Sequence, residues 1–353
     1  MTDNRYFVCY SYDPGPAPID IADPAPDIPE YHRDVLRVFE REMAGAGLTV
    51  YLTWKIHELP TTGRDVVAVV MGDEWSRTPL YAQDVLATFK VYGHVPRLGF
   101  RLFSRPTWVK ALLALKYVRA AAHGTHGMAR RAAARLHGTP PPIVPIPLGF
   151  GNQAELPVRP LAERGTDVFF AGSVEHGRRS RLSPAYWLRN PKTLAREQML
   201  DSLERLQAAR PDLSVRTSTT PSFTLNALYY GTEDGADALG VDEYSAAMMD
   251  AKICLVPRGT NVETYRYFEA LRYGCVAIAE PQPDFSFYRG APVIQIDDWR
   301  GLGRVVEGLL VDPAHMLKLH TEGRDWWREH CSPKAIGTMM ASAVRNATAR
   351  GST

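Results

Sequence analysis

The segment from residue 251 to 280 constrains the fold more than any other part of this chain. Two apolar runs, AKICLVP and VAIAEP, flank a segment that begins as a glycine loop and continues as a helix, with Tyr267, Phe268 and Leu271 on one helical side. An apolar run, a glycine loop, a helix and a second apolar run are, in this order, typical of parallel strands joined by a crossover helix.

The same alternation recurs on both sides of residue 150. Strands are expected at 5–12, 48–54, 64–74, 166–173, 212–219, 252–257, 276–280 and 292–296. Helices are expected at 31–47, 194–211, 241–251 and across 300–345. The Pro- and Gly-rich segment at 143–151 is typical of a link between domains. The chain is therefore predicted to be α/β, with two domains of parallel sheets and helices joined at about residue 150 and a cleft between them.

These patterns give the expected domain limits. The N-terminal domain is expected at 1–149 and the C-terminal domain at 150–334, with a helix at about 335–353 as a candidate to pack back on the first. The 353 residues suit two domains of ordinary size. The first residues lack a secretory signal, and no run is long and uncharged enough to span a membrane. We therefore expect a cytoplasmic protein with four reduced cysteines and no metal.

Charge is distributed unevenly along the chain, although its net charge is only +2. No Asp or Glu occurs between Val85 and Ala154, whereas that span holds ten Lys or Arg residues. Such a field attracts anions to one part of the surface. It predicts an anionic acceptor, or peripheral attachment to the inner face of an anionic membrane through WVKALLALKYVRAAA, although a solvated basic helix face would look the same. No nucleic-acid-binding motif is present.

The loop at 257–264 has the composition of an anion site. A helix N-terminus leaves backbone N–H groups unpaired and carries a partial positive charge. Gly259 permits close approach of the backbone, and Arg258 and Arg266 add charge. The other expected donors are the side chains of Thr260, Asn261 and Thr264. Glu269, inside the helix, is expected to accept hydrogen bonds from ribose hydroxyls, although a solvated helical residue would fit its position as well.

Residues 254–278, CLVPRGTNVETYRYFEALRYGCVAI, resemble the signature of exostosin-like glycosyltransferases. The matching positions are Pro257, Arg258, Gly259, Thr264, Arg266, Glu269, Ala270, Leu271, Gly274 and Cys275. Weaker similarities lie in FFAGS, in IPLGFGN and in VVMGDEW. The resemblance implies the GT-B architecture, in which two Rossmann-like domains with parallel sheets face a central cleft. It also implies transfer of a sugar from a nucleotide diphosphate sugar to a hydroxyl acceptor, with neither metal nor cofactor.

The resemblance also implies roles for individual residues. The donor diphosphate would lie against Arg258, Arg266, Arg196 and the amides of Thr264 and Tyr265. Gly172 and Ser173 would border it, Asn261 would belong to the same loop, and Glu269 would hold the ribose. Many retaining enzymes of this architecture carry a glutamate where this chain has Asn261, so that retaining signature is absent and the stereochemistry stays open. The resemblance to exostosin-like enzymes favours inversion.

An inverting transfer requires a general base on the acceptor side. Asp73 and Glu74, after an apolar strand, are the first candidates, Asp13 is the next, and His94 and His57 are further options. The Asp73–Glu74 pair could equally cap a helix.

The leading hypothesis is a glycosyltransferase that uses a UDP- or GDP-sugar in the synthesis of a bacterial polysaccharide, glycolipid or secondary metabolite. The alternative is an inactive sugar-nucleotide-binding partner subunit with the same fold. An NAD(P) enzyme is disfavoured because no G-x-G-x-x-G follows the first strand, and a serine hydrolase because G-x-S-x-G is missing.

Overall fold

The computed structural model describes residues 3–10, 15–22, 28–151, 153–174, 190–220 and 239–351. The chain divides into two compact units. Unit 1 comprises Met1–Arg97, Leu115–Leu148 and Cys331–Thr353. Unit 2 comprises Leu98–Ala114 and Gly149–His330.

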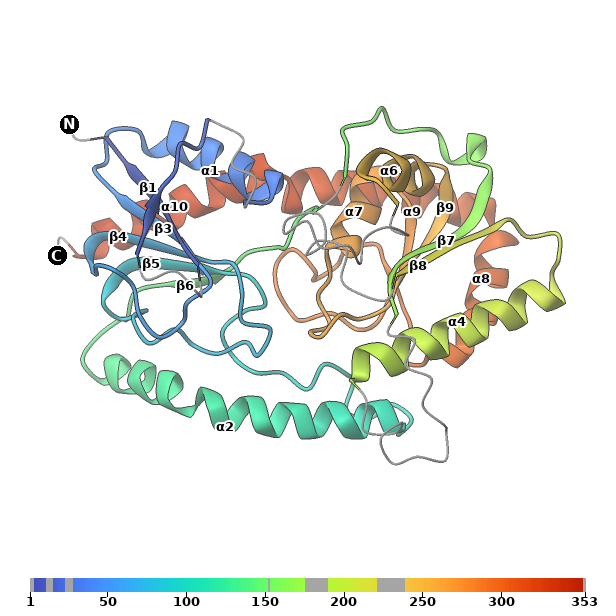
Figure 1. The fold of residues 1–353 in the computed structure, drawn as a ribbon, viewed down its shortest axis with the longest axis horizontal. Coiled ribbons are helices and arrows are strands. Elements are labelled where there is room, and N and C mark those ends of the chain that lie inside the picture. Colours follow the sequence, from blue (N-terminus) through green and yellow to red (C-terminus); the bar gives the residue numbers. More distant parts are fainter. Residues whose placement is uncertain are drawn as a thin grey trace. The chain divides into compact units, whose positions relative to one another are not determined.

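Unit 1 is built on a six-stranded sheet with the order β2-β1-β3-β4-β5-β6 (Figure 1). Its strands are β1 (Arg5–Cys9), β2 (Ala17–Pro18), β3 (Thr49–Thr53), β4 (Gly63–Val70), β5 (Val85–Lys90) and β6 (Ile143–Pro145). All neighbours are parallel except β1 and β2. The near-continuous apolar composition of β3 and β4 fits strands that are buried on both faces of a parallel sheet.

Two helices pack together in unit 1. Helix α1 (Glu30–Met43) contacts α10 (Pro333–Gly351) over much of its length. A Cβ on Gly337 of α10 would lie only 2.6 Å from the Cβ of Val38, so the close helix contact requires a glycine there. The long helix α2 (Trp108–Leu136) begins in unit 2 and continues into unit 1.

Unit 2 contains a five-stranded, fully parallel sheet with the order β11-β10-β9-β7-β8. Its strands are β7 (Thr166–Ser173), β8 (Val215–Thr220), β9 (Ala251–Val256), β10 (Val276–Ala279) and β11 (Ile294–Gln295). The expected parallel arrangement of β9 and β10 around a crossover helix is confirmed, since α7 (Tyr265–Tyr273) joins them.

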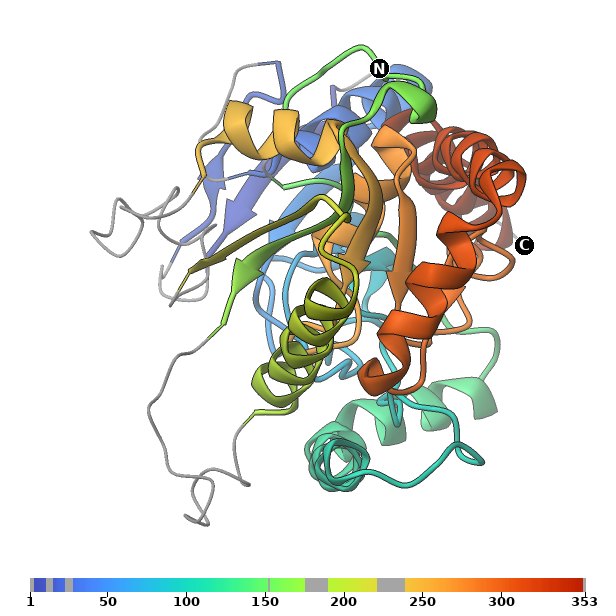
Figure 2. The same ribbon diagram turned by 90° about the vertical axis from the view of Figure 1, so that its right-hand side faces the viewer.

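Helices cover both faces of this sheet. Helices α4 (Pro191–Ala209) and α8 (Leu302–Leu310) lie beside the sheet (Figure 2). The main core lies between these helices and the sheet, where Phe170 and Ile253 meet Met199 and Val306. On the other face, Phe169 of β7 meets Tyr244 of α6 (Val241–Met249). Helix α9 (Pro313–Trp326) contacts α7 and α8. Gly274 ends α7 with φ 68°, and a Cβ there would lie 2.7 Å from His320.

The α/β class with two predominantly parallel sheets is confirmed. The structure differs from the expected elements in three ways. Strand β5 was not predicted, and β6 occurs in the segment read as a linker. The described residues 54–62 and 71–84, which join β3 to β4 and β4 to β5, contain no helix. The four cysteines, all among the described residues, are buried thiols and form no disulfide. Within the described ranges, every helix is too short or too polar to cross a membrane.

Candidate anion-binding site

Strands β7 and β9 are parallel neighbours in unit 2, so their carboxyl ends meet at one edge of the sheet. Gly172 and Ser173 end β7, and the loop 257–264 leads from β9 into α7. This edge therefore brings together the two segments that the sequence assigned to a diphosphate.

Arg266, in the first turn of α7, lies directly against Gly172. A Cβ on Gly172 would be 2.4 Å from Nη2 of Arg266, so only glycine allows the guanidinium to approach this closely. The guanidinium also lies over the ring of Phe170, with 5.0 Å between its central carbon and the ring centroid. Its buried Nε and Nη1 atoms have no hydrogen-bond acceptor among the residues that the structure describes. Arg266 thus retains donors that a ligand could satisfy.

Arg196 of α4 is the second cation of this edge. Its Nε donates to the carbonyl of Arg258 at 3.1 Å, and its Nη1 donates to the carbonyl of Ser173. Burial, followed by the nearby charge of Arg266, lowers the pKa of Arg196 to about 9. The two guanidinium groups therefore repel one another in a poorly solvated place, and a bound anion would relieve that repulsion.

Arg258 is the third arginine, but its side chain points into the protein. Only 1% of it is exposed. Its Nε lies 3.1 Å from Glu280 and its Nη2 donates to the carbonyl of Gly99 at 3.1 Å. Burial lowers the pKa of Arg258, and the carboxylate of Glu280 opposes that shift. The side chain predicted to contact phosphate is thus partly held by protein groups, while its buried Nη1 has no acceptor among the described residues. Its main-chain carbonyl positions Arg196.

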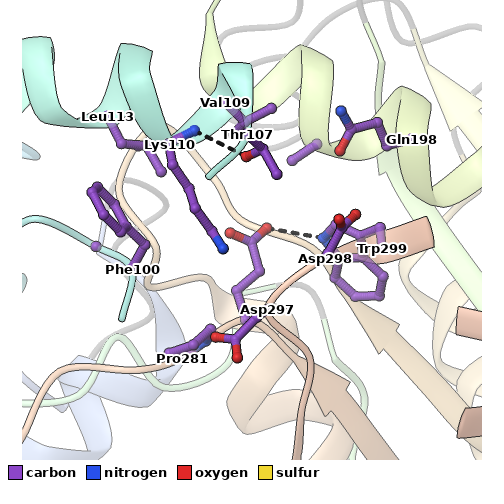
Figure 3. Close-up of a pocket in the computed structure, with 13 residues that line it drawn as sticks. Phe100, Thr107, Val109, Lys110, Leu113, Gln198, Pro281, Asp297, Asp298 and Trp299 are labelled. Carbon is purple, nitrogen blue, oxygen red and sulfur yellow. Dashed lines mark hydrogen bonds between the residues drawn. The ribbon is translucent and has the colours of Figure 1, made fainter. Parts of the chain in front are cut away.

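A small pocket on another side of Glu280 is lined by acidic groups. Figure 3 shows Asp297, Asp298 and Trp299 around it, with Lys110 extending from the start of α2. Glu280 accepts a hydrogen bond from the indole of Trp299 at 3.0 Å. The three carboxylates of this pocket are each paired with an arginine outside its lining: Asp297 with Arg101, Asp298 with Arg300 and Glu280 with Arg258.

The loop before α7 is folded so that its donors remain near the helix N-terminus. The Asn261 side chain accepts from the amide of Val262 at 2.6 Å, which fixes a tight turn. Gly259 packs against the carbonyl of Asn261, where an added Cβ would lie at 3.3 Å. Thr264 is the N-cap residue, yet its hydroxyl makes no capping bond and is buried without a described partner. That hydroxyl and the first amides of α7, from Tyr265 onward, are the expected anion donors.

Glu269 is buried inside unit 2, with 3% of its surface exposed. One carboxylate oxygen accepts from the amide of Gly151 at 3.0 Å and the other from the hydroxyl of Tyr244 at 2.6 Å. Burial, and then the charge of Glu269, raise the pKa of Tyr244 well above its usual value. The predicted ribose contact would have to use the remaining lone pairs of a carboxylate that already has two protein donors.

We expect Glu269→Ala to destabilise the fold by about 2–4 kcal/mol, because the Gly151 amide and the Tyr244 hydroxyl lose their acceptor in a buried place. Glu269→Gln keeps an acceptor oxygen and should cost about 1 kcal/mol. Urea unfolding measures both. If Glu269 also holds a ribose, the Gln variant binds a nucleoside diphosphate more weakly while staying folded, whereas Tyr244→Phe leaves that affinity unchanged. Equal stability of the Ala variant and the native chain would contradict this assignment.

Asp73, the first candidate for a general base, lies in unit 1 after β4 and is already paired. Its carboxylate accepts from the amide and Nε of Arg77 at 2.6 and 2.7 Å, and lies 3.3 Å from Nζ of Lys90. Only 2% of the side chain is exposed. A base must reach its substrate, so this geometry favours a structural role for Asp73.

Backbone strain nevertheless marks this edge of unit 1. Asp73, Ser76 and Tyr92 have φ values of 72°, 55° and 61°, and they are the only non-glycine residues with positive φ among the described part of the chain. The Ser76 hydroxyl donates to the carbonyl of Tyr92 at 2.7 Å and joins the two loops. Left-handed residues of this kind gather at functional sites, so the edge stays a candidate acceptor site.

The other base candidates differ in their surroundings. Glu74 is half-buried beside Asp73. Burial, and then nearby cations of which Arg131 is the first, lower the pKa of His94 to about 4, which makes it neutral but weakly basic at pH 7. His57 is exposed. Asp13 lies outside the described residues, and Glu74 is therefore the most accessible described carboxylate of this set.

Three residues that hold the predicted side chains were not predicted from the sequence: Glu280 and Tyr244 in unit 2, and Lys90 beside Asp73 in unit 1. Glu280 had a visible signal, because an acid directly after an apolar strand lies at the carboxyl edge of the sheet. Tyr244 had none, since its helix gave no reason to single it out. In the described ranges no group of three or more His, Cys, Asp or Glu side chains is arranged to hold a metal.

No protein-family model matches the sequence, and no curated protein matches it. Among solved structures, a sucrose-phosphate synthase from Thermosynechococcus elongatus is 12% identical, with TM-score 0.45, over 90% of this chain and 94% of that chain. A glycosyltransferase from Rickettsia africae is 9% identical, with TM-score 0.45, over 98% of both chains. A chain of the GtfA/B complex is 12% identical, with TM-score 0.42, over 81% of this chain, which spans 58% of its length. Likenesses this weak do not decide the activity of this chain.

Proposed function

We propose that this chain is a glycosyltransferase of GT-B architecture, related to exostosin-like enzymes, that moves a sugar from a UDP- or GDP-sugar to a hydroxyl acceptor. The observation that carries the proposal is Arg266, whose guanidinium lies against Gly172 with buried donors lacking a described acceptor. Arg196 beside it adds a second charge that burial disfavours. A diphosphate between β7 and the start of α7 would accept hydrogen bonds from Arg266 and offset the charge of Arg196.

In the proposed reaction these groups take the place of a metal ion. The bond between the anomeric carbon and the diphosphate oxygen breaks, and the negative charge that develops there is stabilised by Arg266, Arg196 and the α7 amides. The acceptor oxygen forms the new bond from the opposite side of the sugar, which inverts the anomeric centre. Its proton passes to a base, for which we propose Glu74, because Asp73 is held by Arg77 and Lys90.

A thermal-shift titration tests donor binding. A nucleoside diphosphate at about a hundred times its dissociation constant should stabilise the folded chain by about 2.7 kcal/mol, or raise the melting temperature by roughly 5–10 °C. The corresponding nucleoside, which lacks the diphosphate, should raise it far less. UDP, GDP, ADP and dTDP identify the base, and the sugar nucleotides of the best base identify the sugar. Equal shifts from nucleoside and diphosphate would contradict an arginine-based site.

The second candidate function is an inactive sugar-nucleotide-binding subunit. The burial and pairing of Asp73 favour it, because they remove the leading base. Glu74→Gln separates the two functions in an assay of sugar transfer to candidate acceptors. Loss of turnover with unchanged donor affinity supports the enzyme, whereas donor binding without turnover by the native chain supports the subunit.

A further inference from the structure

Helix α2 carries an apolar stripe on its solvent face that the proposed transfer does not use. The stripe consists of positions 108, 111, 115, 118, 122, 125, 129, 132 and 136, which follow one another at alternating steps of three and four residues. Each of these positions is exposed and is occupied by Trp, Leu, Val, Ala or Thr. Leu115 and Val118, in this stripe, are 64% and 62% exposed. Steps of three and four keep side chains on one face of a helix, so these residues form a continuous strip.

The opposite face of α2 already has its packing partners. Gly127 lies so close to the backbone of unit 1 that a Cβ would be 2.3 Å from the carbonyl oxygen of Thr78. Leu113 and Ala120 are buried on the same side. The strip is therefore an additional face, left over after the helix has formed its contacts with the protein.

Apolar exposure continues into the loop before the helix. Leu102 is largely exposed and Phe103 is completely so. Arg101 and Arg105 are exposed on either side of this pair. An exposed Leu-Phe pair between arginines, followed by a tryptophan at the helix start, combines side chains suited to the boundary between lipid headgroups and acyl chains.

The charge of α2 identifies the occupant. Its 29 residues contain no Asp or Glu. Arg119 and Arg135 are exposed beside the strip, and Arg119 lies over the ring of Trp75. A second copy of the helix would bring like charges together, because no acid is present to pair with them across a coiled coil. A membrane with anionic headgroups above an apolar interior would match both the cations and the apolar strip.

We propose that the solvent face of α2, together with Leu102 and Phe103, docks on a membrane that contains anionic phospholipid. The helix lies in the plane of the interface and does not cross the bilayer, since it is too polar to span it. The cations attract the surface, and the strip enters the boundary between headgroups and acyl chains. This inference does not depend on the proposed transfer reaction.

Vesicle sedimentation of the full chain tests this docking without any nucleotide. The native chain should pellet with vesicles of phosphatidylcholine and phosphatidylglycerol at low salt, and bind vesicles of phosphatidylcholine alone much less. Leu115→Glu/Val118→Glu should weaken binding about tenfold or more, by removing apolar contact and adding repulsion. Arg119→Glu should weaken it by about fivefold or more, and high salt should act in the same direction.

Val311→Glu/Leu317→Glu is the matched control, because it places two glutamates at exposed apolar positions outside α2. It should leave vesicle binding unchanged, and thermal melting should show that both double variants are folded. The proposal is overturned if the native chain stays in the supernatant with anionic vesicles, or if both double variants bind equally. It is also overturned if the chain is a dimer in solution that Leu115→Glu/Val118→Glu dissociates while vesicle binding persists.

Discussion

Arg266→Ala should lower the affinity for a nucleoside diphosphate about 10- to 100-fold, because a charge-assisted hydrogen bond contributes about 1.5–3 kcal/mol. The same change should leave stability equal or slightly higher. Arg266 has donors without a described acceptor, and its charge disfavours the protonated form of Arg196. Loss of binding with no loss of stability is the signature of a residue kept for its ligand.

Isothermal titration calorimetry measures the affinity for the nucleoside diphosphate, and urea unfolding measures the stability of each variant. Arg205→Ala is the control, since Arg205 is exposed on α4 and donates to the nearby Ser202 hydroxyl on the same helix. It should bind as the native chain does. An Arg266→Ala variant with native affinity would remove this residue from the site, and one that binds weakly because it is unfolded would assign it a structural role.

Glu280→Gln should destabilise unit 2 by about 3–5 kcal/mol, because it leaves the buried guanidinium of Arg258 without its opposing charge. Arg258→Met should also destabilise unit 2, since the carboxylate of Glu280 then remains without the guanidinium that opposes its charge. The double variant Arg258→Met/Glu280→Gln should cost less than the two single changes together, because neither charge is left alone.

Chemical denaturation of the four chains provides this double-mutant cycle. The expected coupling energy exceeds about 1 kcal/mol, as for residues in direct contact. A coupling energy below that value would show that the ion pair contributes little, and that Arg258 is held by its other contacts, such as the Gly99 carbonyl. Such a result would also return Arg258 to the set of side chains available to phosphate.

The sequence was sufficient for the α/β class because strands buried on both faces form continuous apolar runs. TDVFFAGS at 166–173 coincides with β7, and the run at 252–257 differs from β9 by one residue at each end. Less regular parts were harder to predict. Strand β5 contains Lys90, which is fully buried because it pairs with Asp73, a partner that local spacing cannot reveal.

The candidate site was predicted to the level of segments but not of side-chain direction. The glycine loop, the start of α7 and the end of β7 do meet at one edge of the sheet. The direction of Arg258 depends on Glu280, which is twenty-two residues away in the sequence and one strand away in the sheet. The burial of Glu269 likewise depends on Gly151 and Tyr244, from two distant segments.

The central claim is that a diphosphate binds between Gly172 and the first turn of α7. A crystal structure of the complex with the best nucleoside diphosphate from the thermal-shift series tests it most directly. We predict phosphate oxygens within hydrogen-bond distance of the Arg266 guanidinium, the Thr264 hydroxyl and the first amides of α7. Density for the diphosphate at another place, with Arg266 still lacking an acceptor, would contradict the claim.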